Sequence, residues 1–139
     1  MIVADTGGIL ALLDRDDRHH EKVKRFFAES QSIWTLPWAI LPEVDYLASK
    51  KLGSHVAIAF LHDVEDGHFL VDAHASRDLP RAVALCEKYA DLDLGLADAV
   101  VMAQAERLRA SAIVTLDERH FRTVRLSLKT QPLLVPLDR

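Results

Sequence analysis

The chain has 139 residues, of which 50% are hydrophobic and 27% are charged, and its formal net charge is −4. This length and composition are typical of one folded domain and exclude a disordered or fibrous protein. The single cysteine excludes a disulfide framework and a cysteine-based zinc site, and the acidic balance argues against a broad basic face for nucleic acid. The apolar runs are far shorter than a membrane span, and no leader-like segment opens the chain, so we expect a cytoplasmic protein.

Short apolar runs alternate with helical segments along the chain. Strands are predicted over residues 1–4, 32–36, 68–72 and 112–116, with a last short strand over 133–135. Helices are predicted over 6–13, 21–27, 37–52, 56–64, 79–89 and 95–109. Strands separated by helices favour parallel pairing with right-handed crossovers. We therefore expect a single α/β domain over 1–139, a three-layer α/β/α sandwich with a central parallel sheet of four to five strands.

Four of the 21 acidic residues lie in strongly apolar surroundings. Asp5 and Asp117 directly follow predicted strands, while Glu43 and Asp98 lie within apolar helical segments. A buried carboxylate needs a hydrogen-bond partner, an opposite charge or a metal ion. Because the carboxyl ends of parallel strands share one edge of a sheet, these acids are expected to converge there.

A cluster of carboxylates without thiolates favours a hard ion, Mg²⁺ or Mn²⁺, and suits metal-assisted hydrolysis of a phosphodiester. Each acid also has a simpler interpretation. Asp5 is placed to cap the helix that begins at Thr6, and Asp117 to cap a short turn after it. Glu43 and Asp98 have no such capping role, so the metal-site hypothesis depends most on them.

The four acids lie in segments that together resemble PIN-domain ribonucleases, and most closely the toxins of VapBC toxin–antitoxin pairs. The segments that carry the resemblance are IVADT (2–6), PEVDYL (42–47), LGLADA (94–99) and TLDERHF (115–121). Each motif alone is weakly specific, but all four occur in family order, and the likeness covers essentially the whole chain.

The resemblance implies a dimeric endoribonuclease that depends on Mg²⁺ or Mn²⁺ and is silenced by a cognate VapB-type antitoxin. By position, Asp5 and Asp98 correspond to the principal metal ligands, and Glu43 to the acid that helps to bind the metal or orients water. Asp117 corresponds to the most variable acid, and Thr6 to a hydroxyl residue that supports the site.

Two positions depart from the family pattern. Gly7 stands where many relatives have a second small hydroxyl residue. Pro42, directly before Glu43, removes a helical N–H donor and is expected to kink or restart the helix, which would shift the Glu43 carboxylate.

The basic residues Arg119 and Arg122 follow Asp117 and are candidates for contact with the RNA backbone, although ordinary solvated surface explains them equally well. His120 lies three residues after Asp117, where a substrate contact or, more simply, a capping or surface role is expected. Five apolar residues are expected mainly in the core or in a groove for an antitoxin helix: Val23, Phe26, Phe27, Trp34 and Trp38.

A different class of function remains open from the sequence. A catalytically silent PIN-like scaffold that binds a protein or RNA partner predicts the same fold. A receiver-like phosphoacceptor is disfavoured, because the first strand is followed by Asp5-Thr6 rather than by paired acids.

Overall fold

The computed structural model describes residues 1–139, apart from the side chain of residue 75. Five strands form one sheet in the order β3-β2-β1-β4-β5, and all neighbouring strands are parallel. The strands are β1 (Ile2–Ala4), β2 (Trp34–Pro37), β3 (Phe69–Asp72), β4 (Ala112–Thr115) and β5 (Leu133–Pro136). The predicted last strand is therefore present, and it extends the sheet at the β4 edge.

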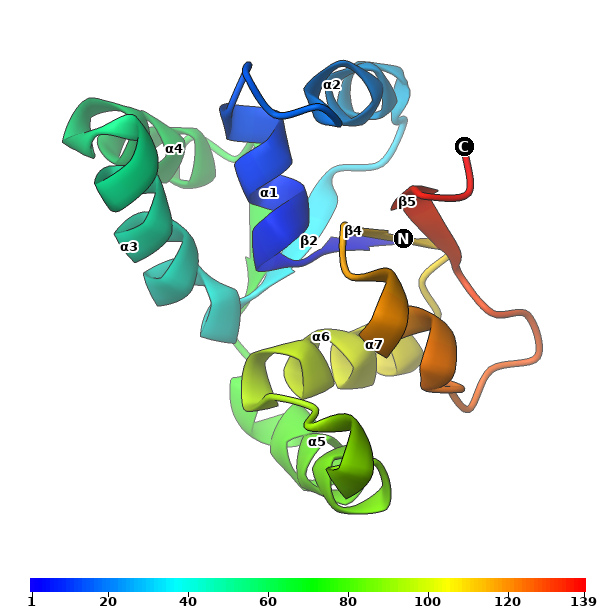
Figure 1. The fold of residues 1–139 in the computed structure, drawn as a ribbon. Coiled ribbons are helices and arrows are strands. Elements are labelled where there is room, and N and C mark those ends of the chain that lie inside the picture. Colours follow the sequence, from blue (N-terminus) through cyan, green and yellow to red (C-terminus); the bar gives the residue numbers. More distant parts are fainter.

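Helices cover both faces of this sheet (Figure 1). The helices are α1 (Thr6–Leu13), α2 (His20–Glu29), α3 (Leu41–Leu52), α4 (Ser54–Glu65), α5 (Ala75–Lys88), α6 (Leu96–Arg107) and α7 (Glu118–Thr123), with 3₁₀ turns η1 (Trp38–Ile40) and η2 (Ala90–Leu92). α1 packs on β4 on one face, and α6 packs on β1 and β2 on the other. This is the expected three-layer α/β/α sandwich.

The strands are short apolar segments because they are buried on both faces. β1, β2 and β4 are buried along their whole length, as central parallel strands between two helical layers must be. α6 is likewise buried from Ala99 to Ala105, which explains its nearly continuous apolar sequence. Asp98 precedes that buried stretch, so its carboxylate lies where α6 meets the carboxyl edge of the sheet.

α1 lies closer to β4 at Gly8 than at Gly7, its neighbour near the start of the helix. A Cβ atom on Gly8 would lie 2.3 Å from the carbonyl oxygen of Val114, whereas a Cβ on Gly7 would meet nothing closer than 3.6 Å. Only glycine permits the approach at Gly8. This approach brings the first turn of α1, with Asp5 at its N-terminus, against the end of β4.

Three local expectations are corrected by the structure. α5 begins at Ala75 and not at residue 79, so Pro80 lies inside the helix, where it leaves the Ser76 carbonyl without its helical N–H donor. Trp34 is fully buried, but Trp38 is 56% exposed and does not belong to the core.

The helical segment predicted over 37–52 is divided at Pro42. The 3₁₀ turn η1 comes first, closed by the Leu41 N–H that donates to the Trp38 carbonyl, and α3 then begins with Pro42 in its first turn. The expected restart of the helix is confirmed. It occurs because proline lacks the N–H needed to continue the preceding turn but fits the start of a new helix.

No helix in the described part of the chain is both long and apolar enough to cross a membrane.

Candidate active site

Asp5 is the most deeply buried acid of the site, with 4% of its surface exposed. It caps α1: Oδ1 accepts a hydrogen bond from the Gly8 N–H at 2.7 Å, and Oδ2 accepts one from the Thr115 hydroxyl at 2.5 Å. Burial raises the pKa of Asp5 to about 7, and the nearby charges of Asp98 and Asp117 add to this rise. The capping role expected from the sequence and a place among the clustered acids therefore coexist at this residue.

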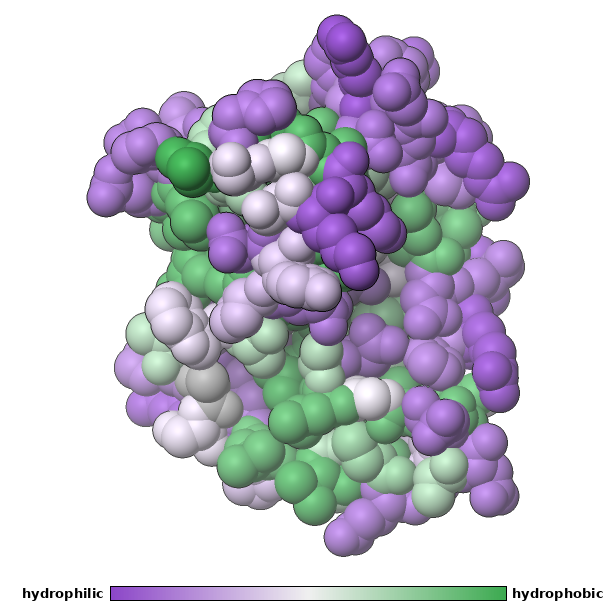
Figure 2. All heavy atoms as spheres, turned by 60° about the vertical axis from the view of Figure 1, so that its left-hand side comes forward, coloured by the Kyte–Doolittle hydropathy of each residue, from purple (hydrophilic) through white to green (hydrophobic). Residues whose placement is uncertain are grey.

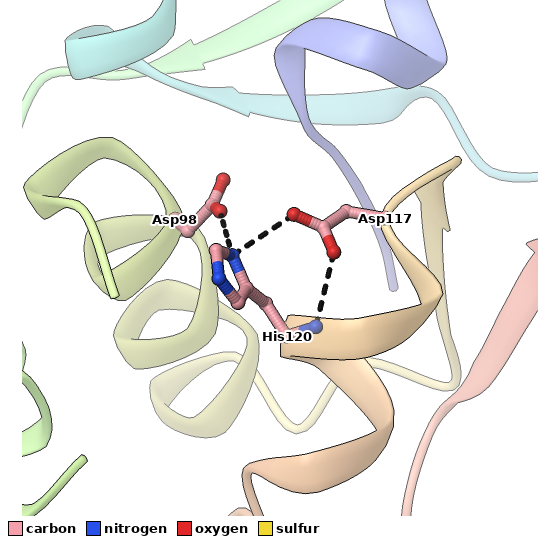
Figure 3. Close-up of side chains that lie close together, drawn as sticks. All are labelled: Asp98, Asp117 and His120. Carbon is pink, nitrogen blue, oxygen red and sulfur yellow. Dashed lines mark hydrogen bonds and ion pairs between the residues drawn. The ribbon is translucent and has the colours of Figure 1, made fainter. Parts of the chain in front are cut away.

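Asp98 and Asp117 approach each other from opposite elements, and the His120 imidazole lies between them (Figure 3). His120 Nδ1 is 2.9 Å from Asp98 Oδ2 and 2.9 Å from Asp117 Oδ2. Asp117 also caps α7, because its Oδ1 accepts the His120 backbone N–H at 3.0 Å. The short helix α7 thus holds His120 at the acids, with its first turn fixed by Asp117 itself.

The charge of His120 is set by its surroundings. Its Nε2 lies 3.2 Å from the Leu92 carbonyl oxygen, so both ring nitrogens face acceptors, which suits the doubly protonated imidazolium. The hydrogen bond to Asp98 raises the pKa of His120, with the charges of Asp117 and Asp98 adding to the effect. Burial raises the pKa of Asp98, and the charges of Asp117 and Glu43 act in the same direction, while His120 opposes the rise.

Glu43 lies in the first turn of α3 with its side chain exposed. Its charge helps to raise the pKa of Asp98. Of the four acids predicted from the sequence, Asp98 and Asp117 lie together around His120, and Thr115 links Asp5 to the backbone of Asp117. Asp5, Asp98 and Asp117 are at least partly buried, whereas Glu43 faces solvent.

A protein-family model of the PIN domain matches residues 2–126. The chain belongs to the PIN domain family. Ribonuclease VapC26 of Mycobacterium tuberculosis is 28% identical over 124 residues, which cover 89% of this chain and 92% of that protein.

The fold is shared with solved toxin structures. VapC20 of Mycobacterium tuberculosis, described as a sarcin–ricin loop cleaving toxin, superposes with a TM-score of 0.71 at 18% identity, covering 81% of this chain and 87% of that one. A toxin–antitoxin complex from Klebsiella pneumoniae superposes with a TM-score of 0.67 at 21% identity, covering 96% of this chain and 99% of that one. DNA-bound VapBC from Salmonella typhimurium gives 0.65 at 18% identity, with 96% and 95% covered. The resemblance to VapBC toxins and the predicted fold are confirmed.

The side chains of this PIN domain fit a divalent metal ion. Asp98, Asp117 and, once it has lost a proton, His120 each offer a ligand atom, and these atoms lie within 4.8 Å of one another. The charges of the same two aspartates help to raise the pKa of Asp5. A donor set dominated by carboxylate oxygens suits Mg²⁺ or Mn²⁺, and a cation would relieve the repulsion that raises the pKa values of Asp5 and Asp98.

The structure adds Thr115 to the residues singled out from the sequence and places His120 between two of the acids. Thr115 supplies the hydroxyl that binds Asp5, and it also accepts the Asp117 N–H at 3.0 Å. The Thr6 hydroxyl, expected to support the site, is buried and has no hydrogen-bond partner among the described residues. His120, considered from the sequence for a substrate contact or a capping or surface role, contacts both Asp98 and Asp117. Both signals were present in the segment TLDERHF: a hydroxyl at the end of a buried strand, and a histidine one helical turn after a capping aspartate.

The two candidate RNA-binding arginines differ in their surroundings. Arg122 donates to Glu118 at 2.8 Å and to Asp138 at 2.5 Å, so its charge is already compensated. Arg119 is exposed and has no ion-pair partner in the described structure. Of the two, Arg119 is the one whose charge remains available to a phosphate.

Proposed function

We propose that this chain is a VapC-type toxin, an endoribonuclease that hydrolyses RNA phosphodiester bonds at a carboxylate site holding Mg²⁺ or Mn²⁺. The observation that carries this proposal is the clustering of Asp98 and Asp117 in a PIN-domain fold, with Asp5 joined to the same strand end through Thr115. The relationship to Ribonuclease VapC26 supports RNA as the substrate. We take 1–139 as one domain, since β5 lies beyond the matched residues yet completes the same sheet.

Asp5, Asp98 and Asp117 are the residues that would hold the ion, with Glu43 at the exposed side. A bound Mg²⁺ or Mn²⁺ supplies positive charge that polarises the phosphodiester and promotes ionisation of water. Thr115 and the Gly8 N–H fix both oxygens of Asp5, so this carboxylate is oriented before any ligand binds. Glu43, exposed beside Asp98, is placed to accept a proton from the attacking water.

A cognate VapB-type antitoxin is the proposed partner, because several structures with this fold are toxin–antitoxin complexes, two of them bound to DNA. Such an assembly would act in the cytoplasm, where RNA and promoter DNA are both accessible.

A homodimer is also proposed, with a second copy covering an apolar surface patch. Leu79 and Val83 of α5 and Leu96 of α6 are 40% to 55% exposed, and hydrophobic side chains gather on the part of the surface where these helices lie (Figure 2). Sedimentation of Leu79→Glu and wild-type protein tests this, since the charge should release monomers.

Cleavage of total RNA by purified, antitoxin-free protein in Mn²⁺ or Mg²⁺ tests the catalytic proposal. Cleavage should disappear with EDTA and with Asp98→Asn, but persist with Asp63→Asn, an exposed aspartate of α4 outside the site. Cleavage that survives Asp98→Asn would contradict the assignment.

The alternative function is a catalytically silent PIN-like scaffold. One observation favours it: the His120 imidazole bridges Asp98 and Asp117, so the two charges are compensated without an ion. A folded protein that neither cleaves RNA nor binds Mn²⁺ in calorimetry would support the scaffold and exclude the nuclease.

A further inference from the structure

A basic cavity lies apart from the acidic site, between α2 and the end of β5. Its volume is about 210 Å³. Figure 1 shows β5 and the C-terminus beside α2, and the two elements are in contact. The walls of this cavity, called here the α2–β5 cavity, include Lys22, Arg25, Phe26, Glu29, Pro136 and Arg139.

Positive charge dominates the α2–β5 cavity. Three of its side chains are basic and one, Glu29, is acidic. Among the described residues these three basic side chains form no ion pair with the side chain of an aspartate or glutamate, as holds for most lysines and arginines of the chain. In a protein of net charge −4, three basic side chains around one cavity favour an anionic ligand.

The cavity is also ordered by contacts among its own walls. The guanidinium carbon of Arg139 lies 5.4 Å from the centre of the Phe26 ring, a cation–π arrangement that holds the planar fork in place. Lys22 Nζ donates to the backbone carbonyl of Arg139 at 3.3 Å. These contacts already order the basic groups, so little further conformational entropy is lost when a ligand binds.

Strand register connects this cavity to the acidic site. Pro136, at the cavity wall, pairs with Thr115 of the neighbouring strand. The Thr115 hydroxyl in turn binds Asp5. Neighbouring strands lie about 4.8 Å apart, so the Pro136 wall of the cavity lies beside the carboxyl end of β4, which Asp117 follows.

We propose that the α2–β5 cavity binds a backbone phosphate of the RNA whose scissile bond lies at the acidic site. This inference rests on the proposed function. A phosphodiester suits the site because guanidinium groups bind phosphate oxygens through paired hydrogen bonds. RNA is favoured over an acidic peptide because one wall of the cavity lies beside the strand that Asp117 follows, so a single polyanion would extend from one site to the other, and a local cationic anchor would offset the repulsion from the acids.

The salt dependence of RNA binding tests this proposal, because each phosphate contact on a single strand adds about 0.7 to the slope of log K against log salt. Binding of a fluorescein-labelled, mixed-sequence single-stranded RNA is measured by anisotropy in EDTA, with every protein carrying Asp98→Asn to prevent cleavage. The double substitution Lys22→Ala and Arg25→Ala removes the contact to one phosphate, so it should reduce the slope by about 0.7 and weaken binding about fivefold at 0.1 M salt. Glu29→Lys should strengthen binding.

Lys24→Ala is the matched control, because Lys24 is exposed on the same helix, carries the same charge and does not line the cavity. Equal slopes for Lys24→Ala and for the cavity pair would overturn the proposal, as would RNA binding too weak to measure in the Asp98→Asn protein. Weakened binding of an acidic antitoxin peptide with an unchanged RNA slope would overturn it in favour of a peptide site. The cleavage assay is independent: nuclease activity with unaltered slopes refutes the cavity assignment alone, and no activity refutes the proposed function.

Discussion

The buried Asp5 makes the stability of the metal-free protein depend on pH. Burial raises its pKa from the ordinary 3.8 to about 7. Between about pH 4 and pH 7 the folded protein retains a proton on Asp5 that the unfolded chain releases. Binding of this proton stabilises the folded state. The stabilisation is complete below about pH 4 and is lost as pH rises towards 7. A shift from 3.8 to about 7, at about 1.4 kcal/mol per unit, corresponds to about 4 kcal/mol.

Asp5→Asn should abolish this dependence. The amide oxygen still accepts the Gly8 N–H, but the Thr115 hydroxyl loses its carboxylate acceptor, at a cost of about 1 kcal/mol that does not vary with pH. The free energy of unfolding of Asp5→Asn relative to wild type should therefore increase by about 3 kcal/mol from pH 5 to pH 8.

Urea denaturation of both proteins in EDTA at pH 5, 6, 7 and 8 measures this difference. Asp63→Asn is the control for loss of an exposed charge. Mn²⁺ at pH 8 should stabilise the wild type and leave Asp5→Asn almost unchanged. If the free energies of unfolding of wild type and Asp5→Asn changed in parallel across this pH range, ionisation of Asp5 would not destabilise the folded protein. Burial would then not raise the pKa of Asp5.

Four further variants probe other contacts of the site. His120→Ala should lower the free energy of unfolding in EDTA by about 1 to 3 kcal/mol, because two partly buried carboxylates lose their shared partner. A higher free energy of unfolding for this variant in urea denaturation would contradict the stabilising role of His120. Gly8→Ala should lower the free energy of unfolding by about 3 kcal/mol, because its Cβ would lie 2.3 Å from the Val114 carbonyl oxygen. Gly7→Ala should be neutral or slightly stabilising. Equal melting temperatures for the two variants would refute the close approach of α1 to β4 at Gly8. Glu43→Gln should leave stability within about 0.5 kcal/mol but reduce RNA cleavage about a hundredfold, and an unchanged rate would remove Glu43 from the site.

Much of the fold could be predicted from the sequence because central parallel strands are apolar on both faces. The segments that became β1, β2 and β4 are short apolar runs, and acids directly after two of them marked the edge of the sheet. The start of α5 could not be predicted in this way, because Pro80 suggested a first turn and the residues before it carry no helical periodicity. Trp38 was misassigned because an apolar side chain next to a buried strand does not reveal which way a 3₁₀ turn presents it.

The sequence by itself determined the fold class and the four acids, since both follow from local patterns: alternating strands and helices, and charges within apolar surroundings. Only the tertiary structure decided what surrounds each acid. Thr115 and Asp5 are 110 positions apart, and His120 reaches Asp98 across 22 positions. Lys22 likewise reaches the main-chain oxygen of Arg139 across 117 positions. Such contacts depend on strand order and helix approach, which bring together residues that no spacing in the sequence connects.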